Sequence, residues 1–209
     1  MDKTKIAVDI FNRLAHSYQE KFMDVSLYHD SFDLFCESIE KENAEVLELA
    51  CGPGNITKYL LERRPDLKIL GIDLASNMLE LAKKNNRNVS VQLMDFREII
   101  SLNKTFDAVM CGFALPYLSK EEAVKLIADA ALILNAGGVV YISTMEDDYN
   151  KSGFEKGSTG EEIFMHYHEA GYLTNALENN GFEILKLMRE EFVKQDGTGT
   201  DLLILSRLK

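Results

Sequence analysis

Short apolar runs alternate with segments of helical periodicity along most of the chain. Runs that suit buried strands occur at residues 46–50, 67–72, 89–93, 106–111 and 139–144. The segments between them carry apolar residues three and four positions apart, which indicates helices packed on a sheet. Two more strands are expected at 182–188 and 202–208, with QDGTGT as the hairpin turn between them. This order predicts an α/β fold with a doubly wound, mostly parallel sheet and a terminal antiparallel strand.

The same pattern divides the chain into four parts of one domain, because no linker or repeat interrupts it. Residues 1–42 are expected to form a cap of two amphipathic helices, with an aromatic-rich connection between them. Residues 43–145 form the core, and residues 171–209 form the last helix and the hairpin. Between these, residues 146–170 lose the periodicity and are predicted to be a loop that acts as a lid.

Two serines are predicted to begin helices. Ser76 suits the N-cap of the helix after the second strand. Ser119 and Glu122 form a capping box before the helix that follows the fourth strand. The face of that helix predicted to point inward carries Val124, Ile127, Ala128 and Ala131.

The stretch VLELACGPGNIT, residues 46–57, passes from an apolar strand into a glycine turn and then a helix. Gly52 and Gly54 permit a sharp turn and a close approach of a ligand to the backbone. Glu48 interrupts the strand, and a buried carboxylate requires donors, so it is expected near the strand's end, facing a polar cavity. A glycine pair alone is weak evidence, since many tight turns use one.

Further polar positions fall at the carboxyl ends of the predicted strands. Asp73 ends the second strand 19 residues after Gly54, where an acid is placed to accept hydrogen bonds from the hydroxyls of a nucleoside ribose. Asp95 ends the third strand, and residues 111–115 follow the fourth. Ligands of doubly wound sheets bind in the crevice outside these ends. We therefore expect one ligand site there.

Composition and charge narrow the partners. The formal net charge of −11 repels phosphate backbones and anionic membranes, so it disfavours nucleic acid and bilayer and favours neutral or cationic small ligands. The three cysteines suggest neither a disulfide framework nor a zinc site. No apolar leader or membrane-spanning run is evident, so a cytoplasmic protein is expected.

Taken together, LELACGPGN, GIDLASNML, QLMDF, FDAVMCGFALPYL, NAGGVVYIST and the closing hairpin resemble the class I S-adenosylmethionine-dependent methyltransferases over nearly the whole chain. The resemblance implies the strand order 3-2-1-4-5-7-6 with strand 7 antiparallel, and S-adenosyl-L-methionine as cofactor. It implies that the glycine segment lies beneath the methionine part, that Asp73 binds the ribose and that Asp95 meets the adenine amine. The residues it assigns to the cofactor are Glu48, Ala50, Cys51, Gly52, Gly54, Asp73, Leu74, Met78, Asp95, Phe96, Cys111 and Gly112.

Two other kinds of protein share a glycine turn of this type. A nicotinamide dinucleotide site needs a third glycine three residues after the second, and Thr57 stands there instead. A helical cap also precedes the glycine unit, whereas dinucleotide domains tend to begin with it. A protein that binds the cofactor without transferring methyl, as a sensor or partner subunit, has the same glycine turn, so the sequence does not separate it from an enzyme.

The acceptor is expected to be a small molecule. Enzymes that methylate amino groups of nucleic acids carry Asp/Asn-Pro-Pro-Tyr after the fourth strand, and Ala114 to Tyr117 match only its last two residues. Cys111 follows Met110 rather than proline, so it is interpreted as a packing residue. Acceptor contacts are expected from Tyr18, Tyr28, Phe113, Tyr117 and Tyr167, and a base, if the reaction uses one, from His29, His166 or His168. No metal site is predicted, and the protein is expected to be a monomer or homodimer.

Overall fold

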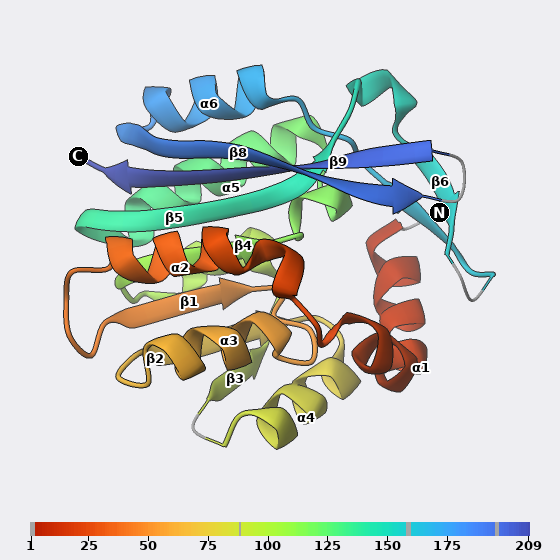
Figure 1. Ribbon diagram of the computed structural model, residues 1–209, viewed down its shortest axis with the longest axis horizontal. Coiled ribbons are helices and arrows are strands. Elements are labelled where there is room, and N and C mark those ends of the chain that lie inside the picture. Colours follow the sequence, from red (N-terminus) through yellow and green to blue (C-terminus); the bar gives the residue numbers. More distant parts are fainter. Residues whose placement is uncertain (1–2, 88, 158–159, 195–196) are drawn as a thin grey trace.

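The computed structural model describes residues 3–87, 89–157, 160–194 and 197–209. Its centre is a seven-stranded sheet in the order β3-β2-β1-β4-β5-β9-β8 (Figure 1). The strands are β1 (Glu45–Leu49), β2 (Lys68–Asp73), β3 (Ser90–Leu93), β4 (Phe106–Gly112), β5 (Leu134–Glu146), β8 (Phe182–Lys194) and β9 (Gly197–Leu208).

The first five strands pair in parallel, and β9 pairs antiparallel with both β5 and β8. Counted within this sheet, β9 is the seventh strand and β8 the sixth, so the predicted order and direction are confirmed. The two strands of the final hairpin run longer than predicted, to Lys194 and from Gly197. Part of the predicted turn, residues 195–196, lies outside the described residues.

Six helices and four short 3-10 segments connect the described strands. The helices are α1 (Lys3–Phe22), α2 (His29–Ser38), α3 (Asn55–Arg63), α4 (Ser76–Asn85), α5 (Lys120–Ile133) and α6 (Ala170–Asn179). The 3-10 segments are η1 (Ser26–Tyr28), η2 (Phe96–Leu102), η3 (Leu115–Tyr117) and η4 (Tyr149–Lys151).

The sheet separates two apolar layers because successive side chains of a strand point to opposite faces. Val46 of β1 packs with α2 and α3, whereas its neighbour Leu47 packs with α5 and α6. Phe32 and Phe35 of α2 lie against Tyr141 of β5, with ring centroids 5.5 and 6.1 Å apart. Burial of these aromatic rings fixes α2 on one face of the sheet.

The predicted cap is divided between two places. Helix α2 covers a face of the sheet, but α1 lies beyond the carboxyl ends of the parallel strands and packs on α4 (Figure 1). Helix α1 also continues to Phe22, so the aromatic segment that contains Tyr18 is helical and not a connection. Its contact residues Ala15, Phe11 and Tyr18 meet Met78 and Leu81 of α4.

Helix α4 is capped by α1 and not by its own serine. The predicted N-cap Ser76 is the first helical residue, and no side chain caps the helix from the preceding position. Instead, Asn12 Oδ1 accepts a hydrogen bond from Asn77 N at 3.0 Å, and the Ser76 hydroxyl donates to the same oxygen at 3.3 Å. The capping box of α5 is confirmed, with both reciprocal bonds between Ser119 and Glu122 present.

The segment predicted as a lid loop contains a small antiparallel sheet. Strands β6 (Gly153–Lys156) and β7 (Glu162–Met165) pair with Phe154 opposite Phe164. The ion pair between Arg13 of α1 and Glu161, 2.7 Å long, joins this hairpin to α1. We call α1 and β7 together the roof, because both lie at the carboxyl ends of the parallel strands.

Gly54, which directly precedes α3, lies in a tightly packed turn where a larger residue should destabilise the fold. Gly54 has φ +77°, and a Cβ there would stand 2.4 Å from Asn86 Nδ2, which donates to Gly54 O. Gly137 has the same φ but no atom within 4 Å of such a Cβ. We expect Gly54→Ala to lower the free energy of unfolding by about 1 to 3 kcal/mol more than Gly137→Ala, because only the first adds overpacking to backbone strain. Equal losses in urea denaturation would show that strain alone matters.

Candidate functional site

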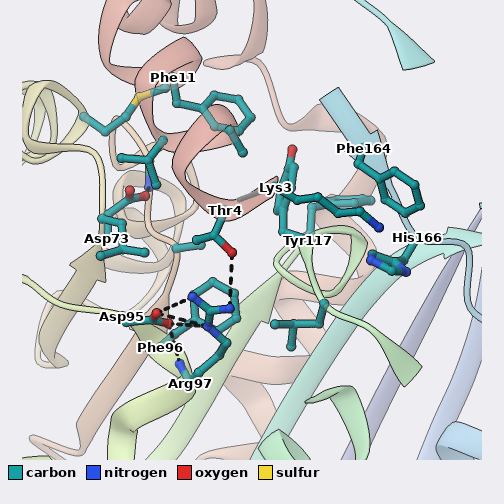
Figure 2. Close-up of a pocket in the computed structure, with 18 of the residues that line it drawn as sticks. Lys3, Thr4, Phe11, Asp73, Asp95, Phe96, Arg97, Tyr117, Phe164 and His166 are labelled. Atoms are coloured by element: carbon teal, nitrogen blue, oxygen red, sulfur yellow. Dashed lines mark hydrogen bonds and ion pairs between the residues drawn. The ribbon is translucent and has the colours of Figure 1, made fainter. Parts of the chain in front are cut away.

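A pocket opens at the carboxyl ends of the parallel strands, beneath the roof (Figure 2). The floor of the pocket is formed by the loop after β1, the ends of β2 and β3 and the loop after β4. The wall that faces this floor is formed by α1 and β7. The lining residues are Lys3, Thr4, Ala7, Val8, Phe11, Tyr18, Ala50, Gly52, Asp73, Leu74, Met78, Asp95, Phe96, Arg97, Gly112, Phe113, Tyr117, Leu118, Phe164 and His166.

The loop after β1 alternates in backbone conformation. Ala50, Gly52 and Gly54 have φ of +49°, +52° and +77°. Successive residues of this kind turn their N–H groups toward one side, and the strain at Ala50, which carries a Cβ, is typical of functional loops. A Cβ on Gly52 would meet only Tyr18 Cε1 of the roof, at 4.0 Å, so the pocket is open above it.

Asp73 links this loop to the next strand. Its Oδ2 accepts from Gly52 N at 2.9 Å, and its Oδ1 accepts from Ala75 N at 2.7 Å. Burial raises the pKa of Asp73, against the effect of these backbone bonds. Each carboxylate oxygen keeps a second lone pair for a ligand hydroxyl in the pocket.

Glu48 lies beneath the loop and does not line the pocket, contrary to the expectation that it faces a polar cavity. Its side chain is 1% exposed and accepts a hydrogen bond from the Thr57 hydroxyl. Thr57 occupies the place of the third glycine of a dinucleotide site, so its role here is to supply the donor that the buried carboxyl group requires. Burial raises the pKa of Glu48 to about 7.

This raised pKa predicts a pH dependence of stability. The folded protein holds a proton on Glu48 at pH values at which the unfolded chain, with an ordinary pKa of 4.5, has lost it. The stability that the protonated Glu48 contributes to the folded state is therefore fully present below pH 4.5. As the pH rises to about 7, the free energy of unfolding falls by up to about 3 kcal/mol. We expect Glu48→Gln to raise the free energy of unfolding at pH 8 and to leave it nearly unchanged at pH 4. Urea denaturation at both pH values measures this, and a pH-independent difference between the two proteins would contradict it.

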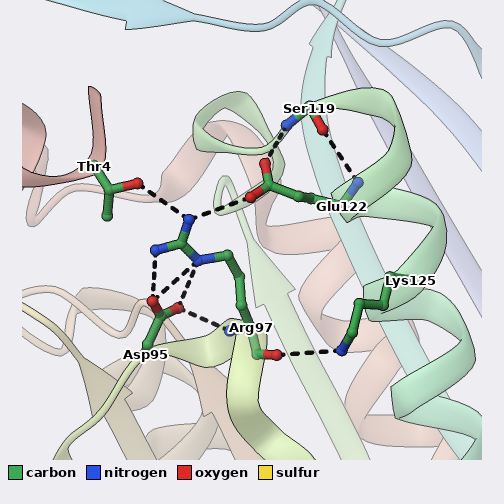
Figure 3. A network of polar contacts seen from close by, with 6 residues as sticks. All are labelled: Thr4, Asp95, Arg97, Ser119, Glu122 and Lys125. Atoms are coloured by element: carbon green, nitrogen blue, oxygen red, sulfur yellow. Dashed lines mark hydrogen bonds and ion pairs between the residues drawn. The ribbon is translucent and has the colours of Figure 1, made fainter. Parts of the chain in front are cut away.

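Asp95 is held by a neighbouring arginine (Figure 3). Arg97 Nε lies 3.0 Å from Asp95 Oδ1, and Arg97 Nη2 lies 2.6 Å from Oδ2. Burial alone would raise the pKa of Asp95, but the guanidinium and the Arg97 backbone N–H outweigh it and hold the pKa below its usual range. Arg97 Nη1 also donates to Thr4 Oγ1 of α1 and to Glu122 of α5, each at 3.2 Å. The network fixes one end of the roof over Asp95.

Aromatic rings line the part of the pocket away from the Asp95–Arg97 network. Phe11 of α1 contacts Tyr18 and Tyr117 edge to face, with centroids 5.7 and 5.5 Å apart. Phe113 has φ +55°, and its N–H donates to Ser143 Oγ at 3.0 Å. Phe113 packs on Tyr28, whose hydroxyl donates to Asp201 at 2.7 Å, so Tyr28 supports the wall from behind and does not line the pocket.

The residues predicted as bases are dispersed. Only His166 lines the pocket. His29 stacks on Tyr59 with centroids 4.3 Å apart, away from the pocket. His168 is fully buried and is hydrogen-bonded to Leu115 O and to the Tyr172 hydroxyl, and burial lowers its pKa to about 4.

Several predicted contacts lie under the surface of the pocket. Tyr167 donates to Glu155 and holds β6 beside the roof, so its ring does not reach the lining. Buried residues below the floor are Glu48, Cys51, Gly54 and Cys111. Burial raises the pKa of the Cys111 thiol to about 12, which suits the packing role predicted for it.

In the described residues no group of three metal-ligating side chains converges, and no helix is long and apolar enough to cross a membrane.

The wall from α1 was largely missed by the sequence interpretation. Lys3, Thr4, Ala7, Val8 and Phe11 all face the pocket. Their spacing of three and four residues continues to Tyr18 and marks a single helical face, so the stripe was present in the sequence. Leu118, Arg97 and Phe164 were also missed, and their positions depend on tertiary contacts.

Comparison with known proteins identifies the family to which a chain with this pocket belongs. The model of a methyltransferase domain family matches residues 46–138, which include the floor of the pocket. An uncharacterized methyltransferase of Anoxybacillus flavithermus is 31% identical over 143 residues, 66% of each chain. Malonyl-[acyl-carrier protein] O-methyltransferase of Acetivibrio thermocellus is 39% identical over 108 residues, which are 50% of this chain and 36% of the relative. The chain belongs to the class I S-adenosylmethionine-dependent methyltransferases.

The fold agrees with a solved structure over its whole length. Magnesium protoporphyrin IX methyltransferase of Synechocystis PCC 6803 with bound S-adenosylhomocysteine has a TM-score of 0.75, with 15% identity and complete coverage of both chains. At this identity the likeness establishes the fold alone.

S-adenosylmethionine is the cofactor of this family, and the pocket fits it. The fit rests on the space above Gly52 and on the acceptor capacity of Asp73 beside it. Tyr18 and Tyr117 also line the pocket, and across the described part of the chain no hydrogen bond occupies the hydroxyl of either. No pyrophosphate cradle is needed for this ligand, in agreement with Thr57 at the third glycine position.

Proposed function

We propose that the protein transfers a methyl group from S-adenosylmethionine to a small-molecule acceptor by direct in-line displacement. The observation that carries the proposal is the floor of one pocket, which brings together Ala50 and Gly52, Asp73, and the Gly112–Phe113 corner. In this arrangement Asp73 receives the ribose, Asp95 the adenine amine and the loop the methionine part. The corner after β4 then borders the reacting methyl group.

The protein's own contribution to the reaction is orientation. Phe113 is held by the double contact of its N–H with Ser143 O and Oγ, at 3.2 and 3.0 Å. Tyr117 is held against Phe11 of the roof. Alignment of this kind lowers a barrier by about 7 to 11 kcal/mol without covalent catalysis. The bound cofactor supplies an electrophilic methyl group, and no nucleophile is assigned to the protein, because the Cys111 thiol is buried and protonated.

A small acceptor is favoured over nucleic acid by the roof and by charge. Helix α1 and β7 cover the pocket, whereas a flipped base needs an open cationic approach. The net charge of −11 opposes such an approach. The relatives do not identify the acceptor, since one is named for a malonyl group on a carrier protein and another for magnesium protoporphyrin IX. The three free, buried cysteines agree with a reducing compartment, which supports the proposal of a cytoplasmic protein.

The test is turnover with a cell extract. The protein, S-adenosylmethionine labelled in its methyl group and a fraction of small metabolites are incubated together, and label in metabolites and S-adenosylhomocysteine are measured by mass spectrometry. We expect equal amounts of labelled product and S-adenosylhomocysteine. Binding of the cofactor without any labelled product would favour the sensor or partner-subunit alternative.

A further inference from the structure

Lys3 faces the pocket, and among the described residues it has no acidic partner. Lys3 lines the pocket, and its Nζ lies 3.2 Å from the centroid of the Phe164 ring (Figure 2). Other lysines of this acidic chain, such as Lys41 and Lys104, form ion pairs of 2.8 and 2.6 Å. Within the described residues no carboxylate lies within ion-pair distance of Lys3.

A second donor stands beside Lys3. The Tyr149 hydroxyl lies 3.3 Å from Lys120 N and 3.2 Å from His166 Nδ1. Lys120 N–H can only donate, so the hydroxyl accepts from it and keeps its own proton, which it can donate to Nδ1. In the tautomer that accepts this proton at Nδ1, which the proposal below uses, His166 carries its own proton on Nε2 and is a donor there. Burial first, and then the charge of Lys3, lower the pKa of His166, so the ring is neutral at neutral pH.

These donors are remote from the part of the floor assigned to the methionine group. Tyr18 Cε1 lies 4.0 Å from the place where a Cβ on Gly52 would stand, and Tyr18 follows Lys3 by 15 residues of continuous helix, a rise of about 22 Å. Figure 2 shows Lys3, Phe164 and His166 together on the side of the pocket away from Asp73. They are therefore available to the acceptor and not to the carboxylate of the cofactor.

We propose that the methyl acceptor carries a carboxylate, bound by the Lys3 ammonium and the His166 Nε2–H. The proposal rests on the proposed methyltransferase function and names the class of its acceptor. The net charge of the whole chain favours neutral or cationic ligands, but a carboxylate within 4 Å of an ammonium responds mainly to that local charge. Phe164, which lies against Lys3, offers an apolar surface to the rest of such an acceptor.

The experiment compares matched acids and amides in the presence of saturating S-adenosylhomocysteine. Benzoate, phenylacetate and hexanoate are each paired with the primary amide, and binding is measured by ligand-observed NMR. We expect the wild-type protein to bind the acids roughly 10- to 100-fold more tightly than the amides, the range for a charged hydrogen-bond partner. Lys3→Gln should lose this preference and Lys3→Arg should keep most of it. Lys58→Gln, which alters an exposed lysine of α3, should not change it.

The outcomes separate this inference from the proposed function. Failure of the wild type to bind S-adenosylhomocysteine would contradict the proposed function itself. Normal binding of it with equal affinity for acids and amides, or with no detectable binding of either, would overturn the inference alone. A Lys3→Gln variant that keeps the preference, or that loses affinity for S-adenosylhomocysteine, would also overturn it. Independently of any variant, acid binding to the wild type should weaken with ionic strength while amide binding should not.

Discussion

Replacing Asp73 with alanine is expected to weaken S-adenosylhomocysteine binding by at least 1.5 to 3 kcal/mol, roughly 10- to 100-fold or more. The carboxylate is proposed to accept both ribose hydroxyls, and it also holds Gly52 N and Ala75 N in place. Its loss therefore removes ligand contacts and loosens the loop under the methionine group. Isothermal titration calorimetry of the wild type and the variant measures the difference.

Asp107→Ala is the matched control. Asp107 also accepts a backbone N–H, from Glu45 at 2.9 Å, but it lies at the opposite, amino end of the parallel strands. The control should lose stability without losing affinity for S-adenosylhomocysteine. An unchanged dissociation constant in Asp73→Ala, or equal losses in both variants, would contradict the assignment of Asp73 to the ribose.

Removal of residues 1–24 is expected to lower kcat by about 100-fold or more, because the acceptor and the reacting methyl group lose the wall that orients them. Helix α1 buries little of itself, chiefly Ala7, Ile10 and Ala15. It is otherwise attached through polar contacts such as the ion pair of Arg13 with Glu161 and the bond of Arg97 to Thr4. The sheet and its five other described helices should still unfold cooperatively. Affinity for S-adenosylhomocysteine should fall by about tenfold, because the truncation removes Tyr18, which lines the pocket beside Gly52.

A double variant controls for damage to the fold. Arg13→Gln with Thr4→Val breaks two tethers of α1 while every element remains. It should lower kcat less than the truncation does and leave the melting temperature within a few degrees. Full activity of the truncated protein would show that α1 does not form part of the working site.

The floor of the site was predictable from the sequence because local constraints determine it. The loop at Gly52 and Gly54 needs residues that tolerate positive φ, and Asp73 follows a short apolar strand whose register is fixed by burial on both faces. Parallel connectivity then brings the carboxyl ends together. These features depend on local conformation and on strand order, so pattern and spacing were sufficient to predict them.

The roof was not predictable in the same way because it depends on tertiary contacts. The Asn12 cap of α4, the contact of Lys3 with Phe164 and the network around Arg97 join residues far apart in the chain. Strands β6 and β7 are four residues each, too short to give a clear alternation.

Helix α5 shows a related difficulty. Its predicted inward face included Val124, which is 38% exposed, whereas Ala123 and Leu126 are buried. In a helix rich in alanine and isoleucine, neighbouring faces are similarly apolar, so periodicity alone does not choose between them. Of the histidines predicted as bases, His29 and His168 lie outside the pocket and His166 lines it, because only tertiary packing distinguishes a buried His168 from a pocket-lining His166.

The most direct test of the central claim is a calorimetric titration of the wild-type protein with S-adenosylhomocysteine and, separately, with NAD. The pocket is open above Gly52, and Thr57 stands at the third glycine position of the loop. Such a site should bind one S-adenosylhomocysteine per chain with a dissociation constant of roughly micromolar order. It should give no heat of binding with NAD, because no pyrophosphate cradle is present in the described loop. Tighter binding of NAD than of S-adenosylhomocysteine would contradict the account.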